Sequence, residues 1–562
     1  MVRRVAMVVL LTGVLAAPAH GQGTELMPGV TYEQTVEFTP HGAVVLNVLT
    51  APRPGGLYQL APVLGLAAVT GGTEKLTQIE QSVSTLATVA GINGDLFDAK
   101  TGEPAGTLIQ NGALEHTPYG TRSSIGIDTT GALHVDRLKL FATWQGDGQR
   151  RPLNEINDTP APGDTALFTP SYGAAAPKVS GSVDVVLEPF PAALPNSDLS
   201  APVTALGTGG GEPIPPGGAV LMATGAAAAK LQAEAPLGTQ TTTRLVTTPT
   251  WTGVIAGIGG GPALVKNGKP IFHSTEAFPS DQVTSRAPRA GIGQLADGRI
   301  VLVAVDGGQP GYSVGLTSFE LAQAMVQLGA VTASAVGSGS AVTEAFDGKL
   351  LNRSNAPGGE LPVKEGLLVE YYGVYAPQSP VPLVNGDIGR TQEPLSFKIV
   401  RPSTVTAQLL GPDGTTNALE TGVQQPAGTY TFTSPPLAAE GTWHWNVTAT
   451  DDLGRASTID RPFLYDTTLK GVTAPKVAHG QAAVRFTLSR PATVKLQIET
   501  QTGIVIQALP AASLAAGAQS LTWNGTLSTG TRAYAGTYVA HVFATSSVGT
   551  SDLAVPFSYK RS

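Results

Sequence analysis

The chain has no cysteine among its 562 residues, and charged residues make up only 13% of it. Without cysteine, disulfide bonds and thiolate metal sites are excluded, so an oxidising compartment poses no problem for this protein. The charged fraction is about half of the usual ~25%. Asp and Glu (41) outnumber Lys and Arg (34), and the formal net charge of −7 argues against a nucleic-acid partner, which would need a basic surface.

Long apolar runs are also missing beyond the N-terminus. Residues 1–21 contain an arginine pair, an apolar run and the small-residue cleavage motif Ala17-Pro18-Ala19. This order is typical of a secretory signal peptide, and the apolar run is too short to span a bilayer. We therefore expect a secreted or extracellular protein that leaves by the general secretion route and has no membrane span.

Glycine (68) and proline (43) are abundant, and Thr, Val and Ala dominate the remainder. This composition predicts many short strands and turns, and the length predicts about three or four domains. We expect an α+β domain over residues 22–380, with mixed sheets, few helices and a looser inserted segment at about 140–250. One helix is well marked, because Thr317 and Glu320 have capping-box spacing and Gly329 is a natural stop.

Beyond about residue 390 the chain repeats itself. The segment from Phe397 to Val405, FKIVRPSTV, recurs from Phe486 to Val494 as FTLSRPATV. Two such units of short strands predict all-β immunoglobulin-like sandwiches at residues 381–467 and 468–562. The second of these sandwiches, at residues 468–562, also contains LTWNG and AGTYVAHV, and it resembles the Ig-like repeat of flagellar hook-capping proteins. Modules of this kind serve as spacers or as contacts to cell-envelope glycans.

Polar residues follow several apolar strands in the first domain. Asn93 and Asp95 stand in GINGDLFD, Arg289 in RAPRAGIG, and Asp306 opens DGGQP after the strand IVLVAV. An arginine beside glycines suits phosphate recognition, and a carboxylate at the end of a strand suits acid/base chemistry. The same residues also suit Asx turns or a surface ion pair, and this alternative remains open for each motif taken alone.

A Gly/Ser turn follows the marked helix. Its backbone amides and hydroxyls are of the kind that cradle a phosphate or sugar oxygens, although such turns are common. The turn consists of Gly337, Ser338, Gly339 and Ser340.

The order of these motifs is more specific than any one of them. GINGDLFD, GIGGGPALVKNGK, RAPRAGIG, DGGQPGYSVGLTSFELAQAMVQLGA and GSGSAVTEAFDGKLLNRSNAPGGELPV follow one another over about residues 30–375. In this order they resemble the phosphodiester glycosidase family. The resemblance implies a hydrolase that cleaves the bond between a sugar's anomeric carbon and a phosphodiester. Taken together with the signal peptide, it leads us to expect an exported hydrolase of sugar-1-phosphodiester linkages in envelope or extracellular polysaccharide, with a carbohydrate or sugar-phosphodiester ligand and no cofactor.

The resemblance also assigns residues. Asn93 and Arg289 match polar positions that the family retains, Asp306 matches the Asp of its Asp-Gly-Arg turn, and Glu360 matches the Glu of its Glu-Arg pair. The expected catalytic residues are Asp306, Glu360 and Asp95. The expected substrate-binding residues are Asn93, Arg289, Gly337, Ser338, Gly339 and Ser340.

Three charged positions of the family are missing. The Asp of its Leu-Asp-Gly-Gly-Gly-Ser turn falls on Gly337, or on Val336 after a shift of one residue, and the two arginines fall on Gly308 and Leu361. Losing these charges weakens stabilisation of the transition state if all of them face the ligand. Two functions therefore stay open: a divergent hydrolase, or a catalytically inactive glycan-binding or structural protein of the cell surface.

Other chemistries find less support. Residues 311–315, GYSVG, match the nucleophile elbow of serine hydrolases, but no histidine lies between His273 and His444 to complete a triad. The eight histidines are scattered without an HExxH motif, so we expect no dedicated metal site.

Overall fold

The computed structural model describes residues 23–271, 276–378, 383–384, 392–501 and 503–561. The expected signal peptide lies outside these residues, as does the expected boundary at residues 380 and 381. The chain divides into two compact units, Met1–Ser84 with Val89–Glu370 and Thr85–Thr88 with Tyr371–Ser562. Over the described ranges, no helix is long and apolar enough to cross a membrane. The structure is mostly β with few helices, in line with the expected strand-rich fold.

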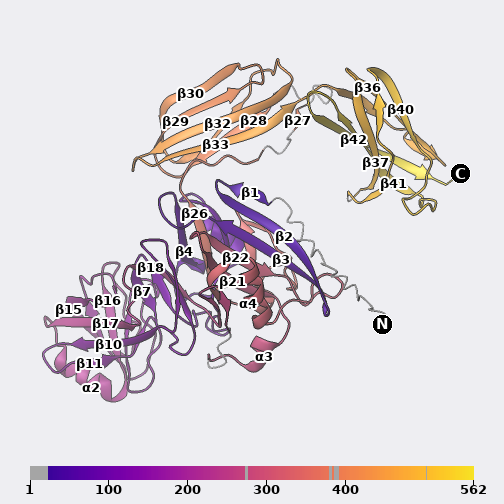
Figure 1. Cartoon of the computed structure of the whole chain (residues 1–562). Helices are drawn as coiled ribbons and strands as arrows, with labels where there is room; N and C mark the ends of the chain where they lie inside the picture. The colour runs from indigo at the N-terminus through magenta and orange to yellow at the C-terminus, as the bar shows by residue number, and fades with distance from the viewer. Residues whose placement is uncertain (1–22, 272–275, 379–382, 385–391, 502, 562) are drawn as a thin grey trace, which may run out of the picture. The chain divides into compact units, whose positions relative to one another are not determined.

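An eight-stranded sheet carries the C-terminal part of the expected site. Its order is β1-β2-β3-β22-β21-β23-β19-β20. Helix α4 (Ser318–Gln327) packs on this sheet through the buried Leu321 and Met325 (Figure 1). Thr317 is the N-cap and forms the predicted capping box with Glu320, so that local prediction is confirmed. The strands are β1 (Thr24–Met27), β2 (Val30–Thr39), β3 (Gly42–Ala51), β19 (Ala263–Lys266), β20 (Lys269–Pro270), β21 (Arg289–Leu295), β22 (Ile300–Val305) and β23 (Ala330–Ala335).

Two five-stranded sheets complete the core of the first unit. One has the order β25-β24-β5-β26-β4 and the other β7-β6-β18-β8-β9. The short helices are η1 (Gly65–Ala67), α1 (Leu76–Val83), α3 (Ser280–Thr284) and η2 (Gly339–Ala341). The strands of these sheets are β4 (Tyr58–Leu64), β5 (Thr88–Asn93), β6 (Leu108–Gln110), β7 (Ala113–His116), β8 (Ser124–Asp128), β9 (Leu133–Asp136), β18 (Val254–Gly259), β24 (Glu344–Phe346), β25 (Lys349–Leu350) and β26 (Glu365–Tyr371).

The loosely patterned segment between β9 and β18 is built around an apolar core to which β6 and β7 also contribute, through Ile109 and Leu114. Its strands form a second eight-stranded sheet, β11-β10-β17-β15-β14-β16-β13-β12, and helix α2 (Gly225–Glu234) packs on it (Figure 1). Trp144, Leu221 and Leu231 are among the buried residues of this core. The strands are β10 (Lys139–Gln145), β11 (Arg151–Leu153), β12 (Glu155–Ile156), β13 (Thr165–Phe168), β14 (Val183–Leu187), β15 (Asp198–Thr208), β16 (Ala219–Ala223) and β17 (Gln240–Thr248).

The second unit contains two modules, each with two sheets around one apolar core. In the first, β28 and β31 form a pair beside the sheet β27-β33-β32-β29-β30; in the second, β34-β36-β40 accompanies β35-β42-β41-β37-β38. The repeated motif has the same role in both modules, because Phe397 and Val405 in one and Phe486 and Val494 in the other are buried. The period-2 burial of these strands is the pattern of a β-sandwich.

The strands of the first module are β27 (Leu383–Val384), β28 (Pro394–Ile399), β29 (Ser403–Leu410), β30 (Thr416–Gln425), β31 (Gly428–Thr433), β32 (Gly441–Asp451) and β33 (Ala456–Tyr465). Those of the second are β34 (Leu469–Thr473), β35 (Val477–His479), β36 (Ala482–Leu488), β37 (Ala492–Thr500), β38 (Val505–Ala508), β39 (Ala512–Leu514), β40 (Gly517–Trp523), β41 (Gly536–Thr545) and β42 (Thr550–Lys560).

Candidate functional site

Asn93, at the end of β5, fastens this strand to the turn after β23. Its Nδ2 donates to the carbonyl oxygens of Gly94 (3.0 Å) and Gly337 (3.2 Å), and its Oδ1 accepts from the Thr343 amide at 3.1 Å. A Cβ atom at residue 337 would lie 2.8 Å from Nδ2, so glycine is required for this close approach. The amide of the expected binding residue Asn93 is therefore committed to the backbone.

The Gly/Ser turn is likewise bonded within the fold. The Gly339 amide donates to the Pro288 carbonyl at 3.0 Å, and the Ser340 carbonyl accepts from the Ser354 hydroxyl at 3.3 Å. Ser338 is half-buried and lies just before η2. The Gly339 amide is therefore bonded within the fold and is not free to bind an anion.

Arg289, at the start of β21, is buried and held by backbone oxygens. Its guanidinium donates to the carbonyls of Leu316 (3.0 Å), Ser285 (2.6 Å) and Gln282. Burial lowers the pKa of this side chain. Arg289 lines a cavity of about 10 Å³ together with Ser338, which leaves space for about one water molecule.

Asp306 follows β22 and sits in a different polar network. It accepts hydrogen bonds from the Tyr312 hydroxyl (2.9 Å), Asn352 Nδ2 (3.1 Å) and the Arg353 amide (3.1 Å). Burial raises the pKa of this carboxyl, and these hydrogen bonds oppose the rise. In the sheet register Arg289 pairs with Val305, the residue before Asp306. The Arg289 guanidinium and the Asp306 carboxylate nevertheless bond to different residues.

Ser313, the central residue of the GYSVG motif, links the backbone of Asp306 to that of β3. Its hydroxyl donates to the Asp306 carbonyl at 2.5 Å and accepts from the Val45 amide at 3.0 Å. The side chain is buried, so these bonds give it a structural role instead of that of a nucleophile.

Glu360 lies at the N-terminus of α1. Its carboxylate accepts from the Thr77 amide (3.1 Å) and the Thr77 hydroxyl (2.8 Å), whereas the N-cap residue Lys75 makes no side-chain capping bond. A carboxylate here satisfies a free helical N–H and interacts favourably with the helix dipole. The geometry gives Glu360 the position of a helix cap, and its catalytic role stays a prediction.

Asp95 forms a buried ion pair with Arg122, a residue that sequence reasoning missed. Arg122 Nη2 lies 3.0 Å from Asp95 Oδ2, and the two side chains are 7% and 3% exposed. Glycines at positions 106 and 259 make room for the carboxylate, because a Cβ atom would lie 2.8 Å and 2.0 Å from Oδ2. Burial raises the pKa of Asp95, and the Arg122 charge opposes that rise. No motif marks Arg122, since its partner is distant in sequence.

Arg122 also borders two aromatic rings and a cleft. Its guanidinium carbon lies 5.1 Å from the ring centre of Tyr119 and 5.3 Å from that of Phe278. The cleft has a volume of about 710 Å³, within the range of small-molecule sites. It is lined by Leu96, Phe97, Asp98, Pro104, Ala105, His116, Thr117, Pro118, Tyr119, Gly120, Thr121, Arg122, Glu155 and Asp158.

The cleft combines acids, a cation and an exposed aromatic side chain. Burial raises the pKa of Glu155, which favours a protonated acid, and Asp158 supplies a second carboxyl group. Tyr119 is 53% exposed and offers a ring face for a sugar. His116 is buried with Nδ1 2.7 Å from the Gly106 carbonyl, and burial lowers its pKa, so the ring is neutral near pH 7.

Glu365 accepts a hydrogen bond from the backbone of Asp95. Its Oε1 accepts from the Asp95 amide at 3.2 Å, while Oε2 has no partner among the described residues. Burial raises the pKa of Glu365 to about 8, and the nearby Asp95 charge adds to the rise. Glu365 is therefore a neutral acid near pH 7, which leaves Asp95 as the anion that pairs with Arg122.

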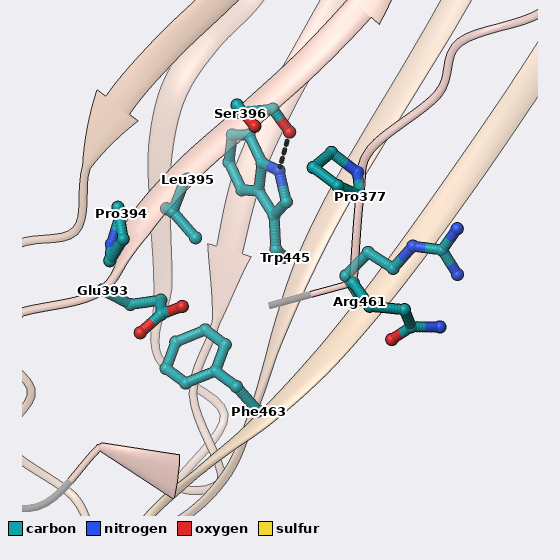
Figure 2. Close-up of a pocket in the computed structure, with 9 residues that line it drawn as sticks. Pro377, Glu393, Pro394, Leu395, Ser396, Trp445, Arg461 and Phe463 are labelled. Atoms are coloured by element: carbon teal, nitrogen blue, oxygen red, sulfur yellow. Dashed lines mark hydrogen bonds between the residues drawn. The ribbon is translucent and has the colours of Figure 1, made fainter. Parts of the chain in front are cut away.

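A separate pocket lies in the first module of the second unit, between β28, β32 and β33. Figure 2 shows Trp445 in its wall, with Nε1 donating to the Ser396 carbonyl at 3.1 Å. Its volume is about 40 Å³, well below the ~300 Å³ of typical small-molecule sites. We therefore place the candidate site in the first unit.

Metal ligands are not gathered at any of these places. Within the part of the chain that the structure describes, no group of three or more His, Asp or Glu side chains is arranged to hold a metal ion.

Comparison with known families matches two segments. Residues 202–370 match the phosphodiester glycosidase family, and residues 473–547 match the FlgD Ig-like domain. The chain therefore carries a phosphodiester-glycosidase-like region followed by a FlgD-type Ig-like module. The first match includes Arg289, Asp306 and Glu360 but begins after Asp95 and Arg122. No curated protein matches the chain.

Solved structures of other proteins are similar to part of this chain. A hypothetical protein from Synechocystis is 26% identical, with a TM-score of 0.52, and the match covers 61% of this chain and 62% of that one. The chain thus spans less than two thirds of that relative. A putative exported protein from Burkholderia pseudomallei is 20% identical over 60% of this chain and 75% of that one, with a TM-score of 0.47. The zebrafish N-acetylglucosamine-1-phosphodiester alpha-N-acetylglucosaminidase catalytic domain is 13% identical over 63% and 85%, with a TM-score of 0.34.

Proposed function

We propose that the phosphodiester-glycosidase-like domain is an exported hydrolase that cleaves sugar-1-phosphodiester linkages of envelope or extracellular polysaccharide. The observation that carries the proposal is the cleft of about 710 Å³ with Arg122 in its wall. Its size admits a sugar, and the Arg122 guanidinium, which is paired with Asp95, lies in its wall. The family match over residues 202–370 supports the reaction class.

The chemistry assigned to the cleft needs two carboxyl groups. Glu155, whose pKa burial raises, donates a proton to the leaving phosphate oxygen, and Asp158 accepts a proton from the attacking water. Arg122, through its pair with Asp95 and its bond to the Ala105 carbonyl, holds the wall of the cleft in place beside these acids. Tyr119 packs against the apolar face of the sugar.

The test is release of free sugar from a panel of sugar phosphodiesters and nucleotide sugars that includes UDP-N-acetylglucosamine. We expect Glu155→Gln and Asp158→Asn each to lower turnover by about 10²- to 10⁴-fold. Glu37→Gln, which changes an exposed acid on β2, is the matched control and should leave turnover unchanged. Equal turnover in all three variants would remove the cleft acids from the reaction.

A second candidate function is glycan binding without catalysis. Val336 is apolar and buried at one of the two positions where the family has its Asp, and the cavity beside it holds about one water molecule. Saturable binding of an envelope glycan without sugar release, weakened by Tyr119→Ala, would favour this function. In both cases we propose that the Ig-like modules act as spacers or as contacts to envelope glycans.

A further inference from the structure

His541, in the second Ig-like module, lies between two carboxylates. Its Nδ1 is 3.1 Å from Glu499 Oε1, and its Nε2 is 2.7 Å from Asp552 Oδ2. The three residues come from β37, β41 and β42, which are neighbours in one sheet (Figure 1). The next residues on either side of His541, Ala540 and Val542, point into the core, so the cluster lies on the outer face of this sheet. One imidazole ring thus joins three strands.

Both ring nitrogens need a hydrogen atom in this arrangement. A neutral imidazole has one N–H, so it can donate to one of the two carboxylates, and the lone pair of its other nitrogen would then face an oxygen anion. Only the protonated ring donates to both. The side chains of His541 and Glu499 are 21% and 15% exposed, so water screens this contact only in part.

An aromatic ring on the same strand also favours the protonated form. Phe543, two residues along β41, contacts the imidazole with ring centres 4.1 Å apart and ring planes inclined by 32°. The face of an aromatic ring attracts a cation electrostatically. Phe543 therefore adds to the effect of the two carboxylates on His541.

The other charged groups on these strands are one lysine beside the cluster and a pair of residues far from it. Lys495 on β37 is exposed and stands opposite Phe543, in the same row as Asp552. Lys560 on β42 pairs with His479 of β35, eight residues beyond Asp552 and so about 25 Å away along the strand. The sequence of β38, VIQA, carries no charge. Two carboxylates and one exposed ammonium group therefore surround the imidazole.

We propose that His541, Glu499 and Asp552 form a pH-sensitive clamp, which ties β37, β41 and β42 together while the imidazole is protonated and loosens when the proton is lost. The clamp regulates the rigidity of the second Ig-like module. It does not depend on the hydrolysis proposed for the cleft, because the cleft belongs to the other compact unit of the chain.

The direction of the pH dependence follows from these contacts. The hydrogen bond with Asp552 raises the pKa of His541 above its ordinary value, burial opposes the rise, and the hydrogen bond with Glu499 adds to it. An unfolded histidine titrates near pH ~6.5. The clamp therefore contributes its full stability below about pH 6.5, and this contribution is lost as the pH rises through the higher pKa of the folded chain.

The first test is a titration of the histidine ring protons of the full chain, followed by nuclear magnetic resonance. The signal of His541 is identified by its absence from the variant His541→Gln. We expect His541 to titrate above pH ~6.5, and Asp552→Asn should move its titration toward that value. A His541 ring that titrates at or below pH ~6.5 in the parent chain would overturn the proposal.

The second test is backbone hydrogen exchange of β37, β41 and β42 in the full chain at about pH 6 and about pH 9, corrected for the intrinsic exchange rate. Protection in the parent chain should fall by about 3- to 10-fold over this range, and His541→Gln should already show the lower level at about pH 6. His444→Gln is the matched control, because His444 pairs with Asp460 on an exposed face of the first module, and it should behave as the parent chain does. Protection that is constant with pH in the parent chain, or that falls equally in His541→Gln, would contradict the clamp.

Discussion

Arg289 pairs in the β21–β22 hairpin with Val305, the residue before Asp306, but Arg289 and Asp306 share no hydrogen-bond partner among the described residues. Arg289 binds the carbonyls of α3 and of the turn before α4, whereas Asp306 binds side chains and an amide from residues 312–353. Each charged group therefore holds a different segment of the chain against the sheet. A loss of activity in variants of either residue must therefore be judged against the folded fraction.

Arg289→Met should destabilise the first unit strongly. The variant leaves the Leu316, Ser285 and Gln282 carbonyls without their donor, and each unsatisfied buried group costs about 1–3 kcal/mol. We expect a loss of about 2 kcal/mol or more in the free energy of unfolding, measured by urea denaturation. A variant as stable as the parent chain would mean that Arg289 is held loosely and is free for a ligand.

Gly259→Ala should disrupt the Asp95–Arg122 pair. The new Cβ atom would lie 2.0 Å from Asp95 Oδ2, a distance that forces the carboxylate or β18 to move. We expect a loss of about 1–3 kcal/mol in stability and weaker ligand binding in the cleft. Gly217→Ala is the matched control, because nothing lies within 4 Å of its Cβ position. Equal stability of both variants would contradict the tight packing described here.

Local signals in the sequence were sufficient for some of these elements. The Thr317 capping box depends on residues three apart, and the repeated FKIVRPSTV motif depends on strand periodicity, so both could be predicted. Arg122 could not, because its role depends on contacts with Asp95 and Phe278, which come from different parts of the chain. The hydrogen bonds of Asn93 and Arg289 to backbone carbonyls could not be predicted either, because their partners Gly337 and Leu316 are distant in sequence. The motif order predicted the family, while the partner of each side chain required the fold.

Glu360→Ala should act on stability through α1. Removing the carboxylate leaves the Thr77 amide and hydroxyl without their acceptor, and loss of a helix cap costs about 0.5–2 kcal/mol. A double-mutant cycle with Thr77→Ala should show a coupling of about 0.5 kcal/mol or more. If Glu360→Ala instead abolishes sugar release while stability is retained, the residue is catalytic, as the resemblance implies.

Glu365→Gln should make the first unit more stable, and increasingly so as the pH rises. Burial raises the pKa of Glu365 to about 8 in the folded chain, whereas an unfolded glutamate titrates near pH ~4.3. Between these values the unfolded chain releases a proton that the folded chain retains, so the parent chain loses stability as the pH rises through this window. Below about pH 4 the residue makes no such contribution, and above about pH 8 the loss is complete.

Glutamine keeps an oxygen for the Asp95 amide and has no proton to release, so this pH-dependent loss is absent in the variant. We expect the two chains to differ by at least about 1 kcal/mol more at pH 8.5 than at pH 5, measured by urea denaturation of the first unit. Glu37→Gln, on the exposed face of β2, should show no such trend. A difference that is constant with pH would mean that Glu365 is already ionised in the folded protein. The single positive charge of Arg122 would then have to balance two buried carboxylates, Asp95 and Glu365.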